Sequence, residues 1–486
     1  MKLKEILENI NTLNKFNPKL DIKGISYDSR TVKNGDLFVA LPGEKYDGTE
    51  FTAEALNRGA VAIVSEKELD ISKNLILVES ARYALSVISS NFYKYNQTDL
   101  QLIGITGTNG KTTISHLIKY IFSESKIKSF AIGTLGYLTD DGYFTLKHTT
   151  PEAPELYKIL RELNNDGYKV GAIEVSSHGL VKNRVSGISF KGAIFTNLTQ
   201  DHLDFHKNME DYYLAKRRLF EALDIDSFGL VNVDDRYGKR LFTEFGEAFL
   251  RISLFDNSAE YYITSSNLSI DKSAFKVKFP DGNIYDFESG SIGHFNLYNL
   301  LFGIAVGDIM GVEIDIIQGA ILSFIPPTGR LQMIKDKNSR GIYVDYAHTP
   351  DALERVLKTL RELFDGKIIT VFGCGGNRDK DKRPLMGGIA SKYSDKLIIT
   401  SDNPRSEEPE KIIDEIIKGI PSNKVFERIS SRKDAIHRGI ELSDNNSLLL
   451  IAGKGHEDYQ IIGDKVIKFS DIQVVREYLK QRKRNV

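Results

Sequence analysis

The sequence has 486 residues, 41% of them hydrophobic and 27% charged, with a formal net charge of -1 at pH 7. This length predicts about three domains at roughly 150 residues each, and the balanced charge favours neither nucleic acid nor an anionic membrane as a partner. One cysteine, Cys374, excludes an internal disulfide framework and is typical of a reducing compartment. No stretch reaches the roughly 18 apolar residues of a membrane span, and the charged N-terminus lacks a signal-peptide core. We therefore expect a cytoplasmic, monomeric protein that binds neither nucleic acid nor membrane.

Short β-type runs alternate with helical patterns along most of the chain. Such alternation predicts an α/β protein with βαβ units and mainly parallel sheets. The segment of about 250–292 instead alternates polar and apolar residues around Asp281-Gly282, which indicates antiparallel hairpins. We expect strands at 61–66, 75–80, 100–106, 168–176, 191–198, 341–347, 367–373, 396–402 and 447–453.

Two stretches indicate domain boundaries. NFYKYNQTD (91–99) is polar, and SFIPPTGR (323–330) contains a Pro-Pro pair shortly before a new α/β pattern begins. We predict three α/β domains at about 1–98, 99–328 and 329–486. We also expect a hinge near Pro326-Pro327 that closes the third domain onto the second.

The strand at 100–106 leads into GTNGKTT and then into the helical pattern ISHLIKYIFSES. Glycines let backbone N–H groups turn toward an anion, and the start of a helix adds partial positive charge. Lys111 would reach the outer phosphates of a nucleotide, and the Thr112 hydroxyl would bind Mg²⁺. The common loop pattern has glycine where Ile105 stands, so this is a variant, and a glycine-rich turn with an incidental GKT is the alternative. The nucleotide site would comprise Gly107, Thr108, Asn109, Gly110, Lys111, Thr112 and Thr113.

Two strand ends and the helix after them carry candidate metal ligands. Glu174 ends a strand in AIEVSSHGL, where a carboxylate can bind Mg²⁺, although a lone glutamate there could also be a surface residue. For His202, completion of a magnesium shell beside an ATP phosphate is favoured over zinc. Lys216 could be no more than a basic residue on a solvated helix face. The zinc alternative would use Asp201, His202, Asp204 and His206.

Further along the chain, four residues are candidates for the nucleotide. Asn296 and Asn299 have helical i, i+3 spacing and could face a base or sugar, but helix capping or a buried polar contact explains them equally well. Arg330 could bring positive charge onto ATP from across a cleft. Asp345, at the end of a strand, could bind ribose or metal.

Two stretches of the third domain carry arginines after predicted strands, where ligands gather in open α/β sheets. Arg378 lies in CGGNRDKDKRP and Arg405 in SDNPRSEEP. Each could bind a carboxylate through its guanidinium fork, or could be a solvated loop residue. Glu457 in AGKGHEDY could hold an ammonium group. Two cations and one anion around one pocket favour an amino acid with more than one carboxylate.

Seven stretches occur in the order found in Mur ligases, and the whole chain resembles that family: GTNGKTT, EVSSHGL, TNLTQDHLDFH, GHFNLYN, DYAHTP, DNPR and GKGHE. The resemblance implies a small N-terminal domain for a uridine nucleotide, a central P-loop ATPase-like domain and a C-terminal Rossmann-like domain for an amino acid. It also implies an ATP- and Mg²⁺-dependent amide ligase. Such a ligase would convert the D-glutamate γ-carboxylate of UDP-N-acetylmuramoyl-L-alanyl-D-glutamate to an acyl phosphate that an amine then attacks.

The resemblance assigns roles to individual residues. Catalytic roles fall on Lys111, Glu174, His202, Lys216 and Arg330, with Lys216 carbamylated (N6-carboxylysine) so that its added carboxylate bridges to Mg²⁺ alongside Thr112, Glu174 and His202. The UDP-linked substrate would be bound by Ser29, Thr149, Thr150, Ser176 and Arg184, and also by Lys182, where some relatives have glutamine. The amino acid would be bound by Arg378, Asp402, Asn403, Pro404, Arg405, Gly453 and Glu457.

Within the family, DNPR accompanies meso-diaminopimelate, whose distal carboxylate the arginine can pair, so Arg405 favours that amino acid. The alternatives are the same ligase with L-lysine or L-ornithine, and a folylpolyglutamate-synthase-like amide ligase. A third alternative is a nucleotide-switched binding protein without ligase chemistry, which would bind ATP and release no phosphate.

Overall fold

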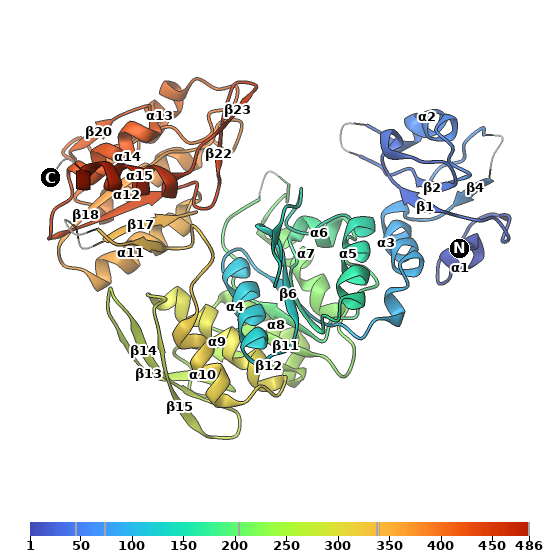
Figure 1. Cartoon of the computed structure of the whole chain (residues 1–486), viewed down its shortest axis with the longest axis horizontal. Coiled ribbons are helices and arrows are strands. Elements are labelled where there is room, and N and C mark those ends of the chain that lie inside the picture. The colour runs from blue at the N-terminus through green and yellow to red at the C-terminus, as the bar shows by residue number, and fades with distance from the viewer. Residues whose placement is uncertain (44–45, 72–73, 203–204, 337–338, 340, 485–486) are drawn as a thin grey trace.

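The computed structural model describes residues 1–486 except 44–45, 72–73, 203–204, 337–338, 340 and 485–486. Figure 1 shows three α/β parts, with the N-terminal and C-terminal parts at opposite ends of the long axis and a larger part between them. The predicted α/β class is confirmed. Across the described residues, no helix has both the length and the apolar character needed to cross a membrane.

The N-terminal part is built on a parallel sheet of order β1-β2-β3-β4. Its two short leading strands were not expected from sequence, because runs of three or four residues between turns carry little periodicity. The strands are β1 (Gly24–Ser26), β2 (Asp36–Val39), β3 (Ala62–Ser65) and β4 (Asn74–Leu77). The helices are α1 (Leu3–Ile6), η1 (Ser29–Thr31), η2 (Gly48–Phe51), α2 (Thr52–Asn57), α3 (Ala81–Phe92) and η3 (Tyr95–Gln97).

Helix α3 joins this part to the central one. Its residue Ser86 donates from Oγ to the Ser186 carbonyl (2.6 Å), and beyond it the Tyr95 ring packs edge-on against Tyr157. One apolar cluster runs without a break from the N-terminal sheet and α3 to one face of the central sheet. The two parts therefore share a core, and this contact fixes how they sit relative to one another.

The central part contains a sheet of order β15-β14-β13-β12-β11-β10-β5-β9-β6-β7-β8. Helices α5 to α8 cover one face and α4, α9 and α10 cover the other. Its strands are β5 (Gln101–Thr106), β6 (Ser129–Gly133), β7 (Gly136–Thr139), β8 (Gly142–Phe144), β9 (Val170–Glu174), β10 (Gly192–Phe195), β11 (Phe228–Asn232), β12 (Phe249–Ser253), β13 (Tyr261–Leu268), β14 (Ser273–Lys278) and β15 (Ile284–Ser289). Its helices are α4 (Lys111–Glu124), α5 (Ala153–Asn165), α6 (Ser177–Val181), α7 (Met209–Glu221), α8 (Arg236–Phe245), η4 (Gly246–Ala248), α9 (His294–Ile309) and α10 (Ile314–Ser323).

The antiparallel segment expected at about 250–292 is confirmed for β13, β14 and β15, which pair antiparallel through a turn at Asp281-Gly282. The prediction was wrong for the start of that segment, because β12 pairs parallel with both β11 and β13. The helix α8 before β12 returns the chain to the same end of the sheet, so this strand continues the βαβ pattern.

The C-terminal part has a sheet of order β16-β17-β21-β18-β19-β20, parallel apart from β16, with a separate hairpin β22-β23. Apolar clusters fill both faces. The strands are β16 (Gln332–Ile334), β17 (Gly341–Asp345), β18 (Lys367–Phe372), β19 (Lys396–Ile399), β20 (Phe426–Arg428), β21 (Ser447–Ala452), β22 (Tyr459–Ile462) and β23 (Lys465–Lys468). The helices are α11 (Pro350–Leu363), α12 (Lys382–Tyr393), α13 (Pro409–Ile417), α14 (Arg432–Glu441) and α15 (Asp471–Arg484).

Candidate functional site

The phosphate loop, residues 107–110, connects β5 to α4 and depends on two glycines. Gly107 has φ 138° and Gly110 has φ 93°, conformations that residues with a side chain rarely adopt. A Cβ on Gly107 would lie 1.9 Å from Thr196 Oγ1, and a Cβ on Gly110 would lie 2.5 Å from Asn299 Oδ1. The surroundings therefore accept only bare backbone here, directly before the N-terminus of α4, which is an arrangement that suits phosphate binding.

The segment after β10 holds this loop. The Thr196 hydroxyl donates to the Asn109 carbonyl (2.6 Å), and the Asn109 N–H donates to Asn197 Oδ1 (3.1 Å). The Thr108 N–H donates to the Asn197 carbonyl (2.8 Å). The shape of the loop is thus set by the protein's own contacts, which is the preorganisation that phosphoryl transfer requires.

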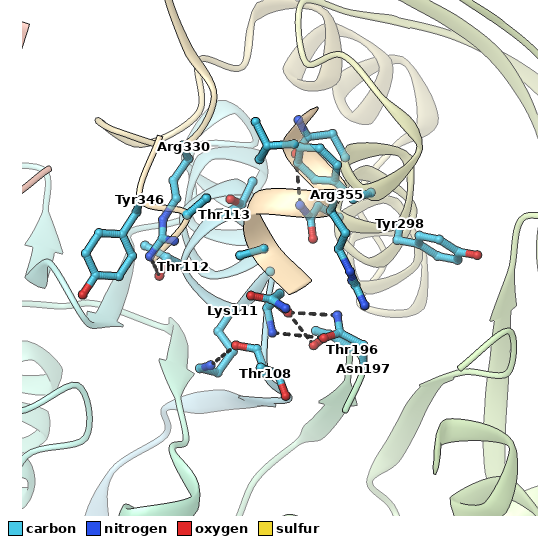
Figure 2. A pocket seen from close by; sticks show the side chains of 18 of the residues that line it. Thr108, Lys111, Thr112, Thr113, Thr196, Asn197, Tyr298, Arg330, Tyr346 and Arg355 are labelled. Atoms are coloured by element: carbon cyan, nitrogen blue, oxygen red, sulfur yellow. Dashed lines mark hydrogen bonds between the residues drawn. The ribbon is translucent and has the colours of Figure 1, made fainter. Parts of the chain in front are cut away.

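A cavity of about 570 Å³ lies between the central and C-terminal parts, next to this loop (Figure 2). Its walls include the carboxyl ends of β5, β9 and β10, which is where ligands bind in open α/β sheets. The predicted residues that line it are Thr108, Asn109, Gly110, Lys111, Thr112, Thr113, Thr149, Glu174, Ser176, His202, Asn296, Asn299, Arg330 and Asp345. Residues predicted for ATP, for metal and for the UDP-linked substrate therefore meet in one place.

Two lysines converge on the carbonyl oxygen of Gly107. Lys111 Nζ donates to it at 2.9 Å and Lys216 Nζ at 2.8 Å, and Lys111 also reaches the Thr108 carbonyl (2.9 Å). Lys216 is 1% exposed, lies over the Tyr212 ring and does not line the cavity. Burial, together with the neighbouring Lys111 charge, holds the pKa of Lys216 well below its usual range, and burial also lowers the pKa of Lys111.

Glu174 is fully buried at the end of β9. The Thr134 N–H donates to its Oε1 and the Thr134 hydroxyl donates to its Oε2, both at 3.0 Å. A Cβ on Gly133 would lie 2.0 Å from Oε1, so any larger residue there would displace the Glu174 side chain. The carboxylate is therefore held rigidly at the cavity wall, where its remaining lone pairs suit a hard cation such as Mg²⁺.

His202 lies on the same side of the cavity as part of a cluster of histidine and tyrosine rings. Its Nε2 is 3.5 Å from Asp201 Oδ2, and its ring packs edge-on against His178 and Tyr212. Among the residues that the structure describes, no group of three or more His, Cys, Asp or Glu side chains could hold a metal ion. Asp204, part of the zinc alternative, lies outside the described residues.

Arg330 reaches across from the C-terminal part. Its Nη2 donates to Thr112 Oγ1 (3.2 Å), and its guanidinium stacks on the Tyr346 ring, 4.9 Å from the ring centroid (Figure 2). Its Nε is buried with no hydrogen-bond partner among the described residues. Arg330 already touches the phosphate loop helix in this structure, so it needs no hinge closure to get there; closure around ligands stays a prediction.

The other residues predicted for the nucleotide make internal contacts. Asp345 accepts the N–H of Leu331 (2.6 Å) and of Ala347 (2.8 Å), and burial raises the pKa of its carboxyl. Asn299 donates to Asn296 Oδ1 (3.0 Å), while Asn296 donates to the Ile292 carbonyl (3.0 Å). The buried polar contact considered for these asparagines is thus present, and Asn299 additionally abuts Gly110 of the phosphate loop.

Residues predicted for the UDP-linked substrate form a network near β9, with one exception. Thr150 bonds Ser176 (Oγ1 to Oγ, 3.0 Å), and Arg184 donates to the Thr150 carbonyl (2.8 Å). Thr149 bonds Thr134 (3.2 Å). Lys182 stands at the end of α6, 5.7 Å from the Phe205 ring. Ser29 lies apart in the N-terminal part, where its hydroxyl donates to Glu54 (2.7 Å).

The residues predicted for the amino acid gather at the carboxyl ends of β18, β19 and β21. Asn403 donates to Glu457 Oε2 (2.8 Å). Gly453 has φ 117°, and a Cβ there would lie 2.7 Å from Asp402 Oδ2. Arg405 donates to the Gly376 carbonyl (2.7 Å). None of the seven predicted residues lines the cavity described above.

The two arginines approach one another over Gly375. A Cβ built on that glycine would lie 3.0 Å from Arg405 Nη1 and 3.8 Å from Arg378 Cγ. Pro404 is buried, and Arg405 adopts a left-handed backbone conformation, φ 53°. The C-terminal sheet therefore presents two cations and a carboxylate on neighbouring loops.

Sequence reasoning missed several residues that build these sites. Thr134, which holds Glu174, follows a strand of ordinary composition, and Asp351 lies on α11. Asp351 Oδ2 accepts from Asn109 Nδ2 (3.1 Å) and Thr199 Oγ1 (3.0 Å), a direct bond from the C-terminal part to the phosphate loop. Lys454, inside the GKGHE stretch, was also passed over. No local pattern marks Thr134 or Asp351, because their partners are distant in the sequence. The ion-pair partner of Lys454, Glu457, lies only three residues away, but its other partner Asn403 is distant.

Three family descriptions match the chain. They are "Mur ligase family, catalytic domain" over residues 21–101, "Mur ligase middle domain" over 105–307, and "Mur ligase, glutamate ligase domain" over 329–455.

Full-length relatives share one name, UDP-N-acetylmuramoyl-L-alanyl-D-glutamate–2,6-diaminopimelate ligase. The protein of that name from Caldanaerobacter subterraneus subsp. tengcongensis is 39% identical, with 99% of each chain covered. The one from Aquifex aeolicus is 43% identical, with 94% of each chain covered. A solved structure with the same name is 33% identical, has a TM-score of 0.73 and covers 99% of each chain.

A more distant structure shares the fold alone. Folylpolyglutamate synthase from Mycobacterium tuberculosis is 16% identical with a TM-score of 0.63, covering 76% of this chain and 92% of its own.

Proposed function

The chain belongs to the Mur ligase family, and from this premise we propose that it is an ATP-dependent amide ligase of peptidoglycan precursor synthesis. It would add meso-2,6-diaminopimelate to UDP-N-acetylmuramoyl-L-alanyl-D-glutamate in the cytoplasm, acting as a monomer. The full-length relatives are named as 2,6-diaminopimelate ligases. The observation that carries the choice of amino acid is the approach of Arg378 and Arg405 over Gly375, since two cations suit a substrate with two carboxylates.

The phosphate loop and its surroundings supply the first half of the reaction. The γ-carboxylate of the substrate's D-glutamate would attack the terminal phosphorus of ATP, releasing ADP and leaving an acyl phosphate. Lys111 and Arg330 would neutralise charge that spreads over the phosphoryl oxygens, since Lys111 contacts the phosphate loop and Arg330 contacts Thr112 at the start of α4. Asn299, which abuts Gly110, would help to bound the nucleotide site.

Magnesium fits the donor set at this cavity. The Glu174 carboxylate, the Thr112 hydroxyl and the His202 imidazole all line the cavity, and two of the three are the oxygen donors that Mg²⁺ prefers. When bound, Mg²⁺ would draw negative charge off the phosphates during transfer. The Lys216 amine would oppose a cation as it stands, whereas a carbamate on it would attract one.

The environment of Lys216 favours that modification. An amine must be unprotonated to attack CO₂: its lone pair forms an N–C bond, one C=O π pair moves to oxygen, and the nitrogen loses a proton. Burial, together with the Lys111 charge, lowers the pKa of Lys216 and so favours the neutral amine more than for an exposed lysine. None of the ion pairs found within the described part of the chain involves Lys216. We therefore assign Lys216 as the carbamylated residue.

The second half of the reaction needs the amino acid's amine at the acyl phosphate. Attack on the acyl carbon gives a tetrahedral intermediate, which collapses to the amide with release of phosphate. Arg378 and Arg405 would hold carboxylates, and Asn403 with Glu457 would hold an ammonium. Ser29 would bind the uridine nucleotide, while Thr149, Thr150, Ser176, Lys182 and Arg184 would contact the muramoyl-dipeptide. The three domains, at about 1–98, 99–328 and 329–486, would thus contribute mainly to the uridine nucleotide, to ATP with the muramoyl-dipeptide, and to the amino acid, in that order.

One assay tests this proposal. Purified protein is given ATP, Mg²⁺ and UDP-N-acetylmuramoyl-L-alanyl-D-glutamate, with meso-diaminopimelate, L-lysine and L-ornithine offered in parallel, and phosphate release and product mass are measured. We expect diaminopimelate to be preferred by at least about 10²-fold in kcat/KM, since a site built for a second carboxylate rejects an analogue without it. Preferred transfer of lysine or ornithine would overturn the pocket assignment, and phosphate release only with folate substrates would overturn the acceptor.

Arg405→Ala is compared with Arg428→Ala, at the exposed end of β20, to separate an effect on the amino-acid pocket from a general effect of removing an arginine. The Arg405 variant should lose diaminopimelate preference, and the Arg428 variant should keep it.

A further inference from the structure

A buried lysine, Lys454, lies among the residues proposed to bind the amino-acid substrate. Lys454 follows β21 and is 0% exposed. Its Nζ lies 2.7 Å from Glu457 Oε2 and 3.2 Å from Asn403 Oδ1. Burying an ammonium is unfavourable unless a partner compensates it. This lysine is therefore placed at a free-energy cost against two residues proposed to bind substrate.

Two glycines turn Lys454 inward. Gly453 and Gly455 flank it, both with positive φ, 117° and 55°. A Cβ on Gly453 would come within 2.7 Å of Asp402 Oδ2, and a Cβ on Gly455 within 2.7 Å of the Tyr346 Cβ. The backbone on each side of the lysine is thus pressed against the cluster, and the lysine side chain fills its interior.

The contacts of Lys454 decide how Asn403 is oriented. Asn403 Oδ1 accepts from Lys454 Nζ and from the Ile461 N–H (3.0 Å), so its Nδ2 must be the group that faces Glu457. Asn403 therefore bonds the lysine, the β22-β23 hairpin and the glutamate at the same time.

Glu457 is held by the same two residues through one of its oxygens. Lys454 Nζ and Asn403 Nδ2 both donate to Oε2. Across the described residues, no hydrogen bond reaches Oε1, and the side chain is 16% exposed. Oε1 is consequently the atom left for a ligand's N–H groups.

We propose that Lys454 is a positioning residue for the amino-acid substrate: it fixes Glu457 and Asn403 so that Glu457 Oε1 faces the incoming ammonium. The inference rests on the proposed function. Lys454 itself does not touch substrate, because its Nζ is enclosed by Glu457, Asn403 and the Tyr459 ring, 5.4 Å to the centroid. Its effect reaches the substrate through Glu457, which it holds both directly and by way of Asn403.

A double-mutant cycle tests the inference. Lys454→Met, Glu457→Gln and the double variant are assayed in the full-length protein for the KM of diaminopimelate, ATP and the UDP-linked substrate. We expect each single variant to raise the diaminopimelate KM by about tenfold or more and to leave the other two KM values within about twofold. Because Lys454 acts through Glu457, the double variant should match Glu457→Gln alone.

The controls separate a local effect from misfolding. Lys465→Met, on the exposed strand β23, should leave all three KM values unchanged. If Lys454→Met does not fold, the double variant, which removes both charges, is compared with Glu457→Gln: equal KM values support the inference and a further rise overturns it. Additive effects, or an equal rise in all three KM values, would also overturn it.

The outcome is distinct from a failure of the proposed function. If the unmodified protein transfers no diamino acid, the proposed function fails. If it transfers diaminopimelate and Lys454→Met keeps the same KM, only the role of Lys454 fails.

Discussion

Two fully buried lysines in this protein, Lys216 in the central part and Lys454 in the C-terminal part, have opposite surroundings. Lys216 Nζ meets the Gly107 carbonyl, the Tyr212 ring and the charge of Lys111. Lys454 Nζ instead meets the carboxylate of Glu457. A buried amine without a counter-charge is driven toward its neutral form, whereas one that faces a carboxylate forms an ion pair.

The contrast teaches that burial alone does not define what a lysine does. The amine of Lys216, which has no ion-pair partner among the described residues, is suited to nucleophilic attack on CO₂. The compensated amine of Lys454 is a structural charge that orients its partners. A buried lysine therefore takes part in the reaction in the central part, whereas in the C-terminal part it positions other side chains.

The largest expected effect is on turnover by Lys216→Met. Without a carbamate, a negative ligand for the metal is lost, so we expect kcat to fall by about 10²-fold to 10³-fold. Lys454→Met should instead change mainly the KM for the amino acid. Steady-state kinetics on both variants check this, and the comparison breaks if kcat falls equally in both.

Removal of CO₂ and bicarbonate should have the next largest effect. Activity should decline on degassing at pH 6 and return on adding bicarbonate, because protonation of Lys216 competes with carbamylation as the pH falls. The depressed pKa of Lys216 means that this loss begins at lower pH than for an ordinary lysine. Activity that CO₂ depletion leaves unchanged at every pH would contradict the assignment of Lys216. As a control, Lys454→Met should show the same response to CO₂ as the unmodified protein.

The two lysines should also affect stability with opposite signs. Lys454→Met leaves Glu457 without its ion-pair partner, which we expect to lower the free energy of unfolding by about 1–3 kcal/mol. Lys216→Met should raise the unfolding midpoint at neutral pH in CO₂-depleted buffer. The folded-state pKa of Lys216 lies below its unfolded-state pKa, so at a pH between these two values the unfolded chain binds more protons than the folded chain. Lys216 therefore destabilises the fold, and its destabilising effect fades as the pH rises toward about 10.

Thermal unfolding of both variants between pH 7 and 10 measures these effects. A gain in unfolding midpoint for Lys216→Met that grows with pH would contradict the predicted effect of Lys216 on stability.

The smallest effect is expected from Asp351→Asn. The central part builds most of the surroundings of Lys216 by itself, through contacts such as the hydrogen bond from Thr196 to Asn109. From the other side of the cavity, Asp351 accepts one bond from the loop residue Asn109 and one from Thr199, so its loss should raise the KM for ATP by less than about tenfold. A larger rise, measured by ATP titration, would mean that the C-terminal part shapes the loop.

Prediction from sequence succeeded where the signal is local. The nine expected strands are all present, and the phosphate loop lies where GTNGKTT follows β5, because strand periodicity and glycine spacing are written in neighbouring residues. The short strands β1, β2, β7 and β8 were missed, since three or four residues carry too little pattern, and the five-residue strands β6 and β11 were not expected either. The parallel pairing of β12 was mistaken for part of a hairpin, because pairing direction depends on the path of the chain.

By itself, the sequence determined the α/β class, the phosphate loop, the candidate arginines and the order of motifs that places the chain in its family. Only the tertiary structure decided that Lys111 and Lys216 share one carbonyl, that Arg330 reaches Thr112, and that Lys454 is paired with Glu457. The charge state and purpose of a buried side chain depend on the atoms within a few ångströms of it. Most of those atoms come from residues that only folding brings near.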